Sequence, residues 1–508
     1  MNSLQTREPW WYNRRNLTIL ALALALIGGV SWRVWVSTHC APGIRRLGGE
    51  CIGVTDGGFV FSPELAKALG KIEAENRRVA QTGKPYVSIA YLVSLPTKAD
   101  QDPSLFEIQR HELQGAHLAQ LRANRTNELG DQPLIRLLVA NAGEESEQWQ
   151  PVVGQLLAKV GSPDRLVAVA GLGESRAATQ EVVVRLTAGG LPVIAARVAA
   201  DSIGGQPGFA RVSVTSSNQA KAAVAYLRKD PEVHRVMLIS DVSRTDTFST
   251  ELAAAFTREA GVAGLTLLQP VEEYDSSQPG VANRFTDMLS SVCLHKPDVV
   301  YFAGRGNDLD AFVEALPGRP CLDTPINIMT GGSGSRTAII LGQEIKAHKD
   351  SLQRGLNANA ALLYTPQAHP GAWAAAPGAF RPEPIRLFQQ QCEDCFASLF
   401  PQESLDDGGA IMGNDAVVTA VTAIRKAAGS RDLGEEPISP GEVIQALRGL
   451  HDLDAVPGAS GWISLGNDGN PTDKAVPIIQ LHPDASIELL AVSSPNAAGA
   501  PFTPPRSS

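Results

Sequence analysis

The stretch from Arg165 to Ser202 constrains the fold more than any other part of the chain. It holds an apolar run at 166–170, a turn bounded by glycines at 171–175, a helical segment, and a second apolar run at 191–195. Short, continuous apolar runs separated by a helix are typical of a parallel sheet that is buried on both faces. The turn places Ser175 and free backbone N–H groups at the start of a helix, where a carboxylate or another anion can bind.

The same alternation of strands and helices precedes this stretch and starts again after it. A chain of 508 residues is too long for one core, so two or more lobes are expected. The pattern therefore predicts two doubly wound α/β lobes. The predicted strands are 86–95, 134–140, 166–170, 191–195 and 209–214 for the first lobe, and 235–240, 264–269, 299–303 and 326–330 for the second.

The order of these elements also predicts the domain boundaries. We place a juxtamembrane segment at 37–83 and a disordered tail at 493–508, where the composition is rich in proline, serine and alanine. Between them, lobe 1 spans 84–214 and is completed by about 336–430, and lobe 2 spans 215–335 and is completed by about 431–492.

The N-terminal region predicts a membrane anchor. Residues 17–36 are mostly apolar, carry no charge except Arg33, and are long enough to cross a bilayer, with tryptophans close to both ends. Arg14 and Arg15 precede this segment, so the positive-inside rule places residues 1–16 in the cytoplasm and the bulk of the chain outside it.

Two other interpretations of this region remain. A cleaved signal peptide is the first, but no A-x-A site follows the apolar core. A lipoprotein attached through Cys40 is the second, although His39 stands where a lipobox has a small residue. An uncleaved, single-pass anchor is the favoured interpretation.

Six cysteines suggest disulfides outside the cytoplasm. We expect one pair between Cys40 and Cys51 and another between Cys293 and Cys321. The pairing of Cys392 and Cys395 stays open, because a disulfide, a redox motif or a zinc ligand pair would each fit a CxxC spacing. The two acidic residues between them disfavour a thiolate, and no second CxxC accompanies them.

Four segments in order resemble the type 1 periplasmic-binding fold, and most closely the leucine or branched-chain amino-acid substrate-binding proteins of ABC transporters. They are GLGESRAATQ at 171–180, LPVIAA at 191–196, VVYFAGRGNDLDAF at 299–312 and the closing GWISLGNDGNPTDKAVPIIQL at 461–481. The resemblance covers about 84–492. It implies a protein without catalytic activity that binds a small molecule between two hinged lobes.

The resemblance also implies ligand contacts. Ser175 would donate a hydrogen bond to a ligand carboxylate, the strand end at Ala195 and Ala196 would supply backbone contacts, and Arg305 would face the ligand from the second lobe. Ser333 stands where amino-acid binders place an acid for the ligand ammonium group. A buried ammonium without a carboxylate is costly, so a neutral or anionic ligand paired with Arg305 is the favoured expectation.

Each of these residues also has an interpretation without a ligand. Ser175 would cap a helix, Arg305 would pair with Asp308 or Asp310 on the surface, and Ser333 would belong to a simple turn. Asp201, which we include among the candidate contacts, would cap a short helix at the rim of the cleft.

Signals for catalysis and for cofactors are weak. Arg176 interrupts a GxGxxG pattern, 331–335 lacks the last glycine of a nucleophile elbow, and the histidines show no metal-binding spacing. The net charge of −9 disfavours nucleic acid as the main partner. We predict a membrane-anchored solute-binding protein with no cofactor or metal, whose partner is an ABC permease or a receptor. The alternative is a scaffold of the same fold that has lost its ligand.

Overall fold

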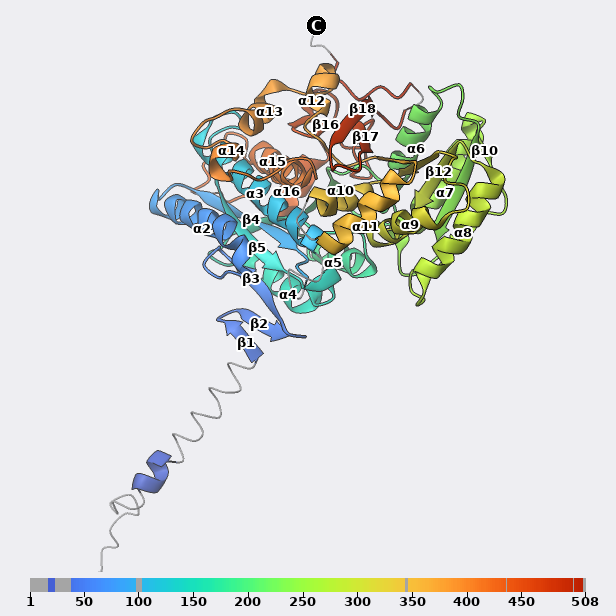
Figure 1. Cartoon of the computed structure of the whole chain (residues 1–508). Coiled ribbons are helices and arrows are strands. Elements are labelled where there is room, and N and C mark those ends of the chain that lie inside the picture. Colours follow the sequence, from blue (N-terminus) through green and yellow to red (C-terminus); the bar gives the residue numbers. More distant parts are fainter. Residues whose placement is uncertain are drawn as a thin grey trace, which may run out of the picture.

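Two α/β lobes lie side by side, with lobe 1 on the left of Figure 1 and lobe 2 on the right. The computed structural model describes residues 17–22, 38–96, 103–342, 346–434, 436–496 and 498–505. The two-lobed fold predicted from the sequence is confirmed. Each lobe is a twisted sheet with helices on both faces, and each face has a separate apolar core.

Lobe 1 contains a sheet with the strand order β1-β2-β3-β5-β4-β6-β7-β8, in which the five strands from β5 to β8 are parallel. Its strands are β1 (His39–Ala41), β2 (Ile44–Leu47), β3 (Glu50–Thr55), β4 (Tyr86–Val93), β5 (Leu134–Asn141), β6 (Leu166–Gly171), β7 (Val193–Ala195) and β8 (Phe209–Arg211). Its helices and small hairpin are α2 (Ala66–Gln81), α3 (Pro103–Arg125), α4 (Trp149–Val160), α5 (Ala177–Ala188), α12 (Ala372–Ala375), α13 (Pro382–Gln389), α14 (Phe396–Leu399), α15 (Gly409–Ala428), α16 (Pro440–Leu447), β15 (Val456–Gly458) and β16 (Gly461–Ile463).

Lobe 2 contains a sheet with the order β10-β9-β12-β13-β14-β17-β18, and β11 also pairs with β9. Its strands are β9 (Arg235–Asp241), β10 (Thr266–Leu267), β11 (Glu272–Tyr274), β12 (Val299–Ala303), β13 (Ile326–Thr330), β14 (Ala360–Tyr364), β17 (Val476–Leu481) and β18 (Ile487–Ser493). Its helices are α6 (Ser216–Leu227), α7 (Thr247–Ala263), α8 (Val281–His295), α9 (Gly306–Ala315), α10 (Gly334–Gly342) and α11 (Lys346–Asn357). Only β17 and β18 run antiparallel to their neighbours.

The chain passes between the lobes after β8, after β14 and between β16 and β17. The predicted boundaries are therefore wrong in two places. Residues 336–342 and 346–364, assigned to lobe 1, lie in or beside α10, α11 and β14 of lobe 2, because β14 pairs with β13. Residues 440–463, assigned to lobe 2, belong to lobe 1, because α16 packs against α15 and Val443 and Leu447 enter its core.

The predicted juxtamembrane segment is also part of lobe 1. Strand β3 pairs antiparallel with β5, and β1 and β2 extend the sheet from there toward the start of the described chain (Figure 1). Residues 1–16 and 23–36 of the predicted cytoplasmic segment and membrane anchor lie outside the described residues. In the part of the chain that the structure describes, no helix is both long and apolar enough to cross a bilayer.

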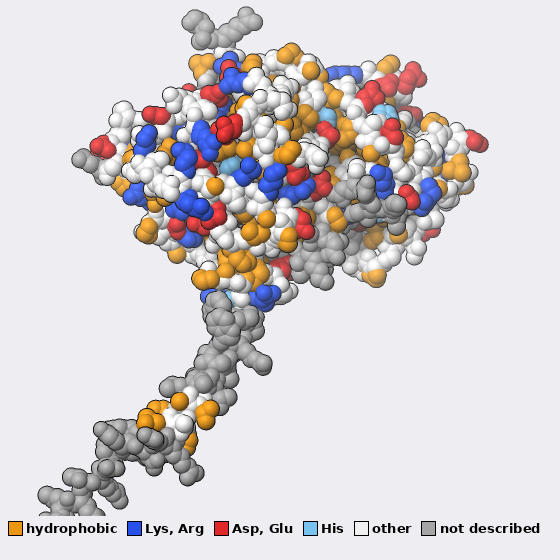
Figure 2. Space-filling view, turned by 60° about the vertical axis from the view of Figure 1, so that its left-hand side comes forward, with side chains coloured by type: hydrophobic (Ala, Val, Ile, Leu, Met, Phe, Trp, Pro, Cys, Tyr) orange, Lys and Arg blue, Asp and Glu red, His pale blue; other side chains and the backbone are white. Residues whose placement is uncertain are grey.

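All six cysteines form disulfides. Cys40–Cys51 and Cys293–Cys321 are the two pairs expected from the sequence, and the first joins β1 to β3. Cys392 pairs with Cys395, and this disulfide lies in the segment between α13 and α14. On the face shown in Figure 2, acidic and basic side chains are interspersed with small hydrophobic areas.

Helices α3 and α15 of lobe 1 touch backbone to backbone. A Cβ atom on Gly115 would overlap the carbonyl of Ala410, and one on Gly413 would overlap the carbonyl of Glu112. Glycine is therefore required at this contact, because any side chain would push the two helices apart.

A buried histidine attaches the segment before α15 to α3. His111 Nδ1 lies 2.6 Å from Asp407 Oδ2, and His111 Nε2 lies 2.9 Å from Glu403 Oε2. Burial lowers the pKa of His111, but the two carboxylates outweigh it and raise the pKa to about 10. His117, on the same helix, has no carboxylate partner among the described residues, and burial lowers its pKa to about 4.

Substitution of Gly413 by alanine tests the helix contact. We expect Gly413→Ala to destabilise the protein by about 1–3 kcal/mol, because the methyl group overpacks the interface. Gly70→Ala is the matched control, since Gly70 lies in α2 with open space at the Cβ position and gains helix propensity instead, by about 1 kcal/mol. Equal urea midpoints for the two variants would contradict the close contact.

Substitution of His111 tests the network around Asp407. The folded-state pKa of His111 is above its unfolded value, so its contribution is complete below pH 6.5 and is lost as the pH rises toward 10. The free energy of unfolding of the wild type should fall in this window by up to about 1.4 kcal/mol per pH unit relative to His111→Gln. His117→Gln serves as the control, because its pKa is lowered and it should differ from the wild type in pH dependence only below pH 6.5. If the free energies of unfolding of His111→Gln and the wild type changed in parallel with pH, the ion pairs of His111 with Asp407 and Glu403 would be excluded.

Candidate functional site

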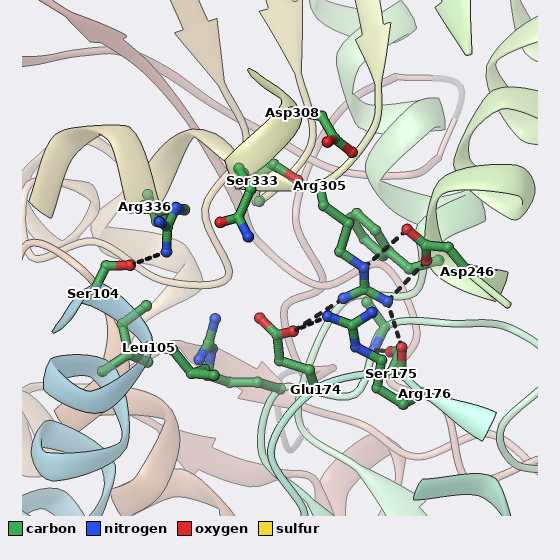
Figure 3. Close-up of a pocket in the computed structure, with 18 of the residues that line it drawn as sticks. Ser104, Leu105, Glu174, Ser175, Arg176, Asp246, Arg305, Asp308, Ser333 and Arg336 are labelled. Carbon is green, nitrogen blue, oxygen red and sulfur yellow. Dashed lines mark hydrogen bonds and ion pairs between the residues drawn. The ribbon is translucent and has the colours of Figure 1, made fainter. Parts of the chain in front are cut away.

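A cavity of about 420 Å3 lies between the two lobes (Figure 3). It sits where the turns after β6, β7, β9, β12 and β13 meet, at the carboxyl ends of the parallel strands of both sheets. Open α/β sheets bind ligands at this edge. Its charged lining residues are Glu144, Glu145, Glu174, Arg176, Arg197 and Asp407 from lobe 1, and Asp246, Arg305, Asp308 and Arg336 from lobe 2.

Ser175 lines the cavity, but its hydroxyl oxygen is engaged within lobe 1. Ser175 Oγ accepts hydrogen bonds from the backbone N–H groups of Ala199 (2.8 Å) and Ala200 (2.9 Å), and the residue is 3% exposed. It therefore joins the turn after β6 to the loop after β7. The residue before helix α5 is Arg176, so Ser175 does not cap this helix with its side chain. Its role as a ligand contact stays a prediction.

Arg305 crosses the cavity from lobe 2 to lobe 1, as Figure 3 shows. Its guanidinium group donates to Asp246 of the same lobe through Nε (2.9 Å) and Nη2 (2.8 Å). It also donates to Glu174 Oε2 of lobe 1 at 3.2 Å and to the carbonyl oxygen of Ser175. The partners proposed for Arg305 from the sequence, Asp308 and Asp310, are not the ones that it contacts.

The ion pair with Arg305 controls the ionisation of Asp246. Burial raises the pKa of this carboxyl, but Arg305 and Ser249 together outweigh burial and hold the pKa below its usual value. Asp246 is the N-cap residue of helix α7, and its carboxylate also accepts hydrogen bonds from the backbone N–H and the hydroxyl group of Ser249. The lowered pKa favours the ionised form of Asp246, which holds the guanidinium group in place.

Of the other predicted ligand contacts, Ser333 lines the cavity, whereas Ala195 and Ala196 do not belong to its described lining. Ser333 lines it and donates a hydrogen bond to the carbonyl of Gly304 at 2.8 Å. Ala195 and Ala196 are buried behind the lining, and their backbone groups are used within lobe 1, by Val212 N–H and Gly171 O respectively.

Asp201 is exposed and does not belong to the described lining of the cavity. Its carboxylate accepts a hydrogen bond from the N–H of Ser217 at 2.8 Å, in the first turn of α6. Asp201 thus caps a helix of lobe 2 from lobe 1, which agrees with its alternative interpretation from the sequence.

Arg197 lines the cavity but was not among the ligand contacts predicted from the sequence. It follows β7 directly and makes one hydrogen bond within the described residues, from Nη1 to the buried carboxylate of Glu112 at 3.3 Å. Most of its five N–H donors are therefore uncommitted. Its place in the sequence, as a charged residue immediately after a buried strand, was the feature that could have identified it as a cavity residue.

Asp308 is the second residue that was missed as a contact. It lies in the first turn of α9, accepts a hydrogen bond from Tyr274 Oη at 3.2 Å, and has no Lys, Arg or His within 4 Å among the described residues. Burial, followed by the nearby charge of Asp241, raises the pKa of Asp308 to about 6. Its position just after β12, at the carboxyl edge of the sheet, could have identified it.

The chemistry available in the cavity is hydrogen bonding and ion pairing. The described lining contains no His, Cys or Lys side chain. Within the described ranges, no group of three His, Cys, Asp or Glu residues is arranged to hold a metal ion. Phe248 adds an aromatic face, 5.4 Å from the guanidinium carbon of Arg305.

Solved structures share this two-lobed fold. A leucine-binding protein from Thermotoga maritima has a TM-score of 0.56 and 17% identity, over 80% of this chain and 98% of its own. A branched-chain amino acid transporter substrate-binding protein from Streptococcus pneumoniae, solved with isoleucine, has a TM-score of 0.53 and 16% identity over 81% and 99%. A fatty acid ABC transporter substrate-binding protein from Thermomonospora curvata has a TM-score of 0.55 and 12% identity over 82% and 94%. At these identities the likeness shows the fold alone.

The sequence itself identifies the family. A comparison with curated proteins gives no match. Residues 164–484, which are more than half of the chain, match the family model described as periplasmic binding protein. The match includes all the turns that bring Ser175, Arg305 and Ser333 to the cavity. The chain belongs to the periplasmic binding protein family.

Proposed function

We propose that this protein is an extracytoplasmic substrate-binding protein of the ABC-transporter type, which closes its two lobes on a small polar ligand. The observation that carries this proposal is the cavity between the lobes, which receives charged side chains from both. Its volume of about 420 Å3 lies within the range of small-molecule sites. Closure of two lobes around such a site is a shift between open and closed populations.

Arg197 is the group that we propose for an anionic part of the ligand. Arg305 was expected in this role from the sequence, but its guanidinium group is bonded to Asp246, Glu174 and the carbonyl of Ser175. Arg197 keeps most of its donors, and a guanidinium group can bind a carboxylate through two hydrogen bonds.

Asp308 is the group that we propose for a donating or cationic part of the ligand. Ser333 stands at the position where amino-acid binders place an acid for the ligand ammonium group, and it has no carboxylate. Asp308 offers a carboxylate from helix α9, which lines the same cavity. The carboxylate of Asp308 from lobe 2 and the guanidinium group of Arg197 from lobe 1 line the same cavity. A ligand of amino-acid size that bears both charges would therefore contact both lobes, which favours closure.

We also propose that residues 17–36 anchor the protein in the membrane, with an ABC permease as partner. The apolar sequence of this segment supports an anchor. The three disulfides fit an oxidising compartment outside the cytoplasm.

A scaffold without a ligand is the second candidate function. It is favoured by the ion pairs inside the cavity, where Arg305 satisfies Asp246 and Glu174 in place of a ligand. Neutralised charges leave fewer groups that require an external partner.

A thermal-shift panel separates the two candidates. Amino acids, short carboxylic acids, sugars and inorganic anions would be added to the full-length protein. A ligand that binds the native state alone raises the melting temperature, by an increment that grows with its concentration. A shift by a zwitterion or a carboxylate supports the binding protein, and a panel without any shift contradicts it.

Substitutions of Arg197 and Asp308 test the proposed contacts with whichever compound gives the largest shift. Arg197→Gln should weaken binding by about 10- to 100-fold, because a hydrogen bond to a charged group contributes about 1.5–3 kcal/mol. For a ligand with a cationic group, wild-type affinity should fall as the pH drops through about 6, where Asp308 gains a proton. This pH dependence should disappear in Asp308→Asn.

Arg185→Met, on the exposed side of α5, is the control for a lost charge and should leave affinity unchanged. Titration calorimetry measures each affinity. Wild-type affinity in both Arg197→Gln and Asp308→Asn would place the ligand elsewhere.

A further inference from the structure

We propose that Arg305 joins the two lobes before any ligand binds, so that the ligand-free protein is predominantly closed. This goes beyond the proposed function, because the bridge consists of the protein's own groups and does not depend on the existence of a ligand.

The bridge consists of two contacts from one guanidinium group of lobe 2 to lobe 1. Nη1 lies 3.2 Å from Glu174 Oε2, and Nη2 donates to the carbonyl oxygen of Ser175 (Figure 3). The side chain of Arg305 is only 15% exposed. Charge-assisted hydrogen bonds at such a partly buried site are stronger than those at an open surface.

Residues of lobe 2 hold the guanidinium group of Arg305 in the orientation that this contact requires. Asp246 holds Nε and Nη2 at 2.9 and 2.8 Å, and the ring of Phe248 lies against the same group. Both partners come from α7, so Arg305 keeps its orientation when the lobes separate. A prepared side chain loses little conformational entropy when it forms the contact with Glu174, which favours the closed state further.

Other polar contacts among the described residues also connect the lobes, including the hydrogen bond from Ser217 N–H to Asp201. Arg336 of α10 donates to the hydroxyl of Ser104 in α3 and also pairs with Asp310 of its own lobe at 3.0 Å. Glu251 of α7 accepts hydrogen bonds from the backbone N–H groups of Asp201 and Ser202 in lobe 1. Each contact therefore adds to the bridge at Arg305.

The cavity of about 420 Å3 persists while Arg305 is in place, so a ligand has room beside the bridge. Lobes that are held together narrow the way into the cavity, so we expect slower association than with a permanently open cleft. Once inside, the ligand meets lobes that already favour closure. The expected signature is slow association, and both the closure and the rate depend on ionic strength.

Distance measurements between spin labels test the proposal on the full-length protein without added ligand. The six native cysteines are paired, so labels attached at Glu181→Cys in α5 and Asp287→Cys in α8 report on the two lobes. The wild type should give one short distance population. Arg305→Met should shift this distribution to longer distances and lower the ratio of closed to open protein by roughly tenfold or more.

Arg176→Met is the matched control. Arg176 lies 2.7 Å from Glu145 and 3.5 Å from Glu174, so it is a charge of the same cavity whose ion pairs stay within lobe 1. It should leave the distance distribution unchanged. Glu174→Gln removes the bridge from the other lobe and should open the protein partly, which keeps the test valid if Arg305→Met folds poorly.

Raising the salt concentration should lengthen the distances in the wild type slightly, because salt screens a partly buried ion pair only weakly, and should leave those of Arg305→Met unchanged. A wild type in which the long-distance population predominates at low salt would overturn the proposal. The proposal would also be overturned if Arg305→Met and Glu174→Gln both gave the same distances as the wild type and the Arg176→Met control. A thermal-shift panel without any hit would leave this result untouched, so the two proposals fail separately.

Discussion

The backbone contact between α3 and α15 sets the shape of lobe 1 and, with it, one wall of the cavity. Gly115 and Gly413 let the two helices approach until carbonyl groups lie where side chains would be. The first turns of α3 carry Ser104, Leu105 and Ile108 to the cavity, and Asp407 reaches it just before α15 begins. A contact between residues almost 300 positions apart thus determines where the ligand site can form.

Buried charge is organised in the same way throughout the region between the lobes. Asp407 is neutralised by His111, and Glu112 is bonded by Arg197 and Tyr91. Burial raises the pKa of a carboxyl group, and it does so for Glu112 despite these partners. Asp308 shows this rise, and it is the carboxylate of the cavity that a ligand could most profitably satisfy.

The comparison with proteins of the same fold shows how little of the site is implied by the fold. Structures with 12–17% identity share two lobes and a cleft, yet they are named for ligands as different as leucine and a fatty acid. In this chain, Arg305 faces the cleft as the family resemblance suggested, but it contacts the protein's own acids. Function in such a family depends on which charges remain free after the internal pairs have formed.

Periodicity and turn chemistry in the sequence were sufficient to predict the alternation of strands and helices, the number of lobes and two of the three disulfides, because these features arise from local patterns. The same patterns could not assign β14 or α16 to a lobe, since a buried strand or an amphipathic helix looks alike in either sheet. Ser175, Arg305 and Ser333, which were predicted as ligand contacts, all line the cavity, and the sequence could point to them because strand ends are local features. Which of their atoms are free was decided only by tertiary structure, because Ala199, Glu174 and Asp246 reach them from distant parts of the chain, and the energy of a charge depends on all the groups around it.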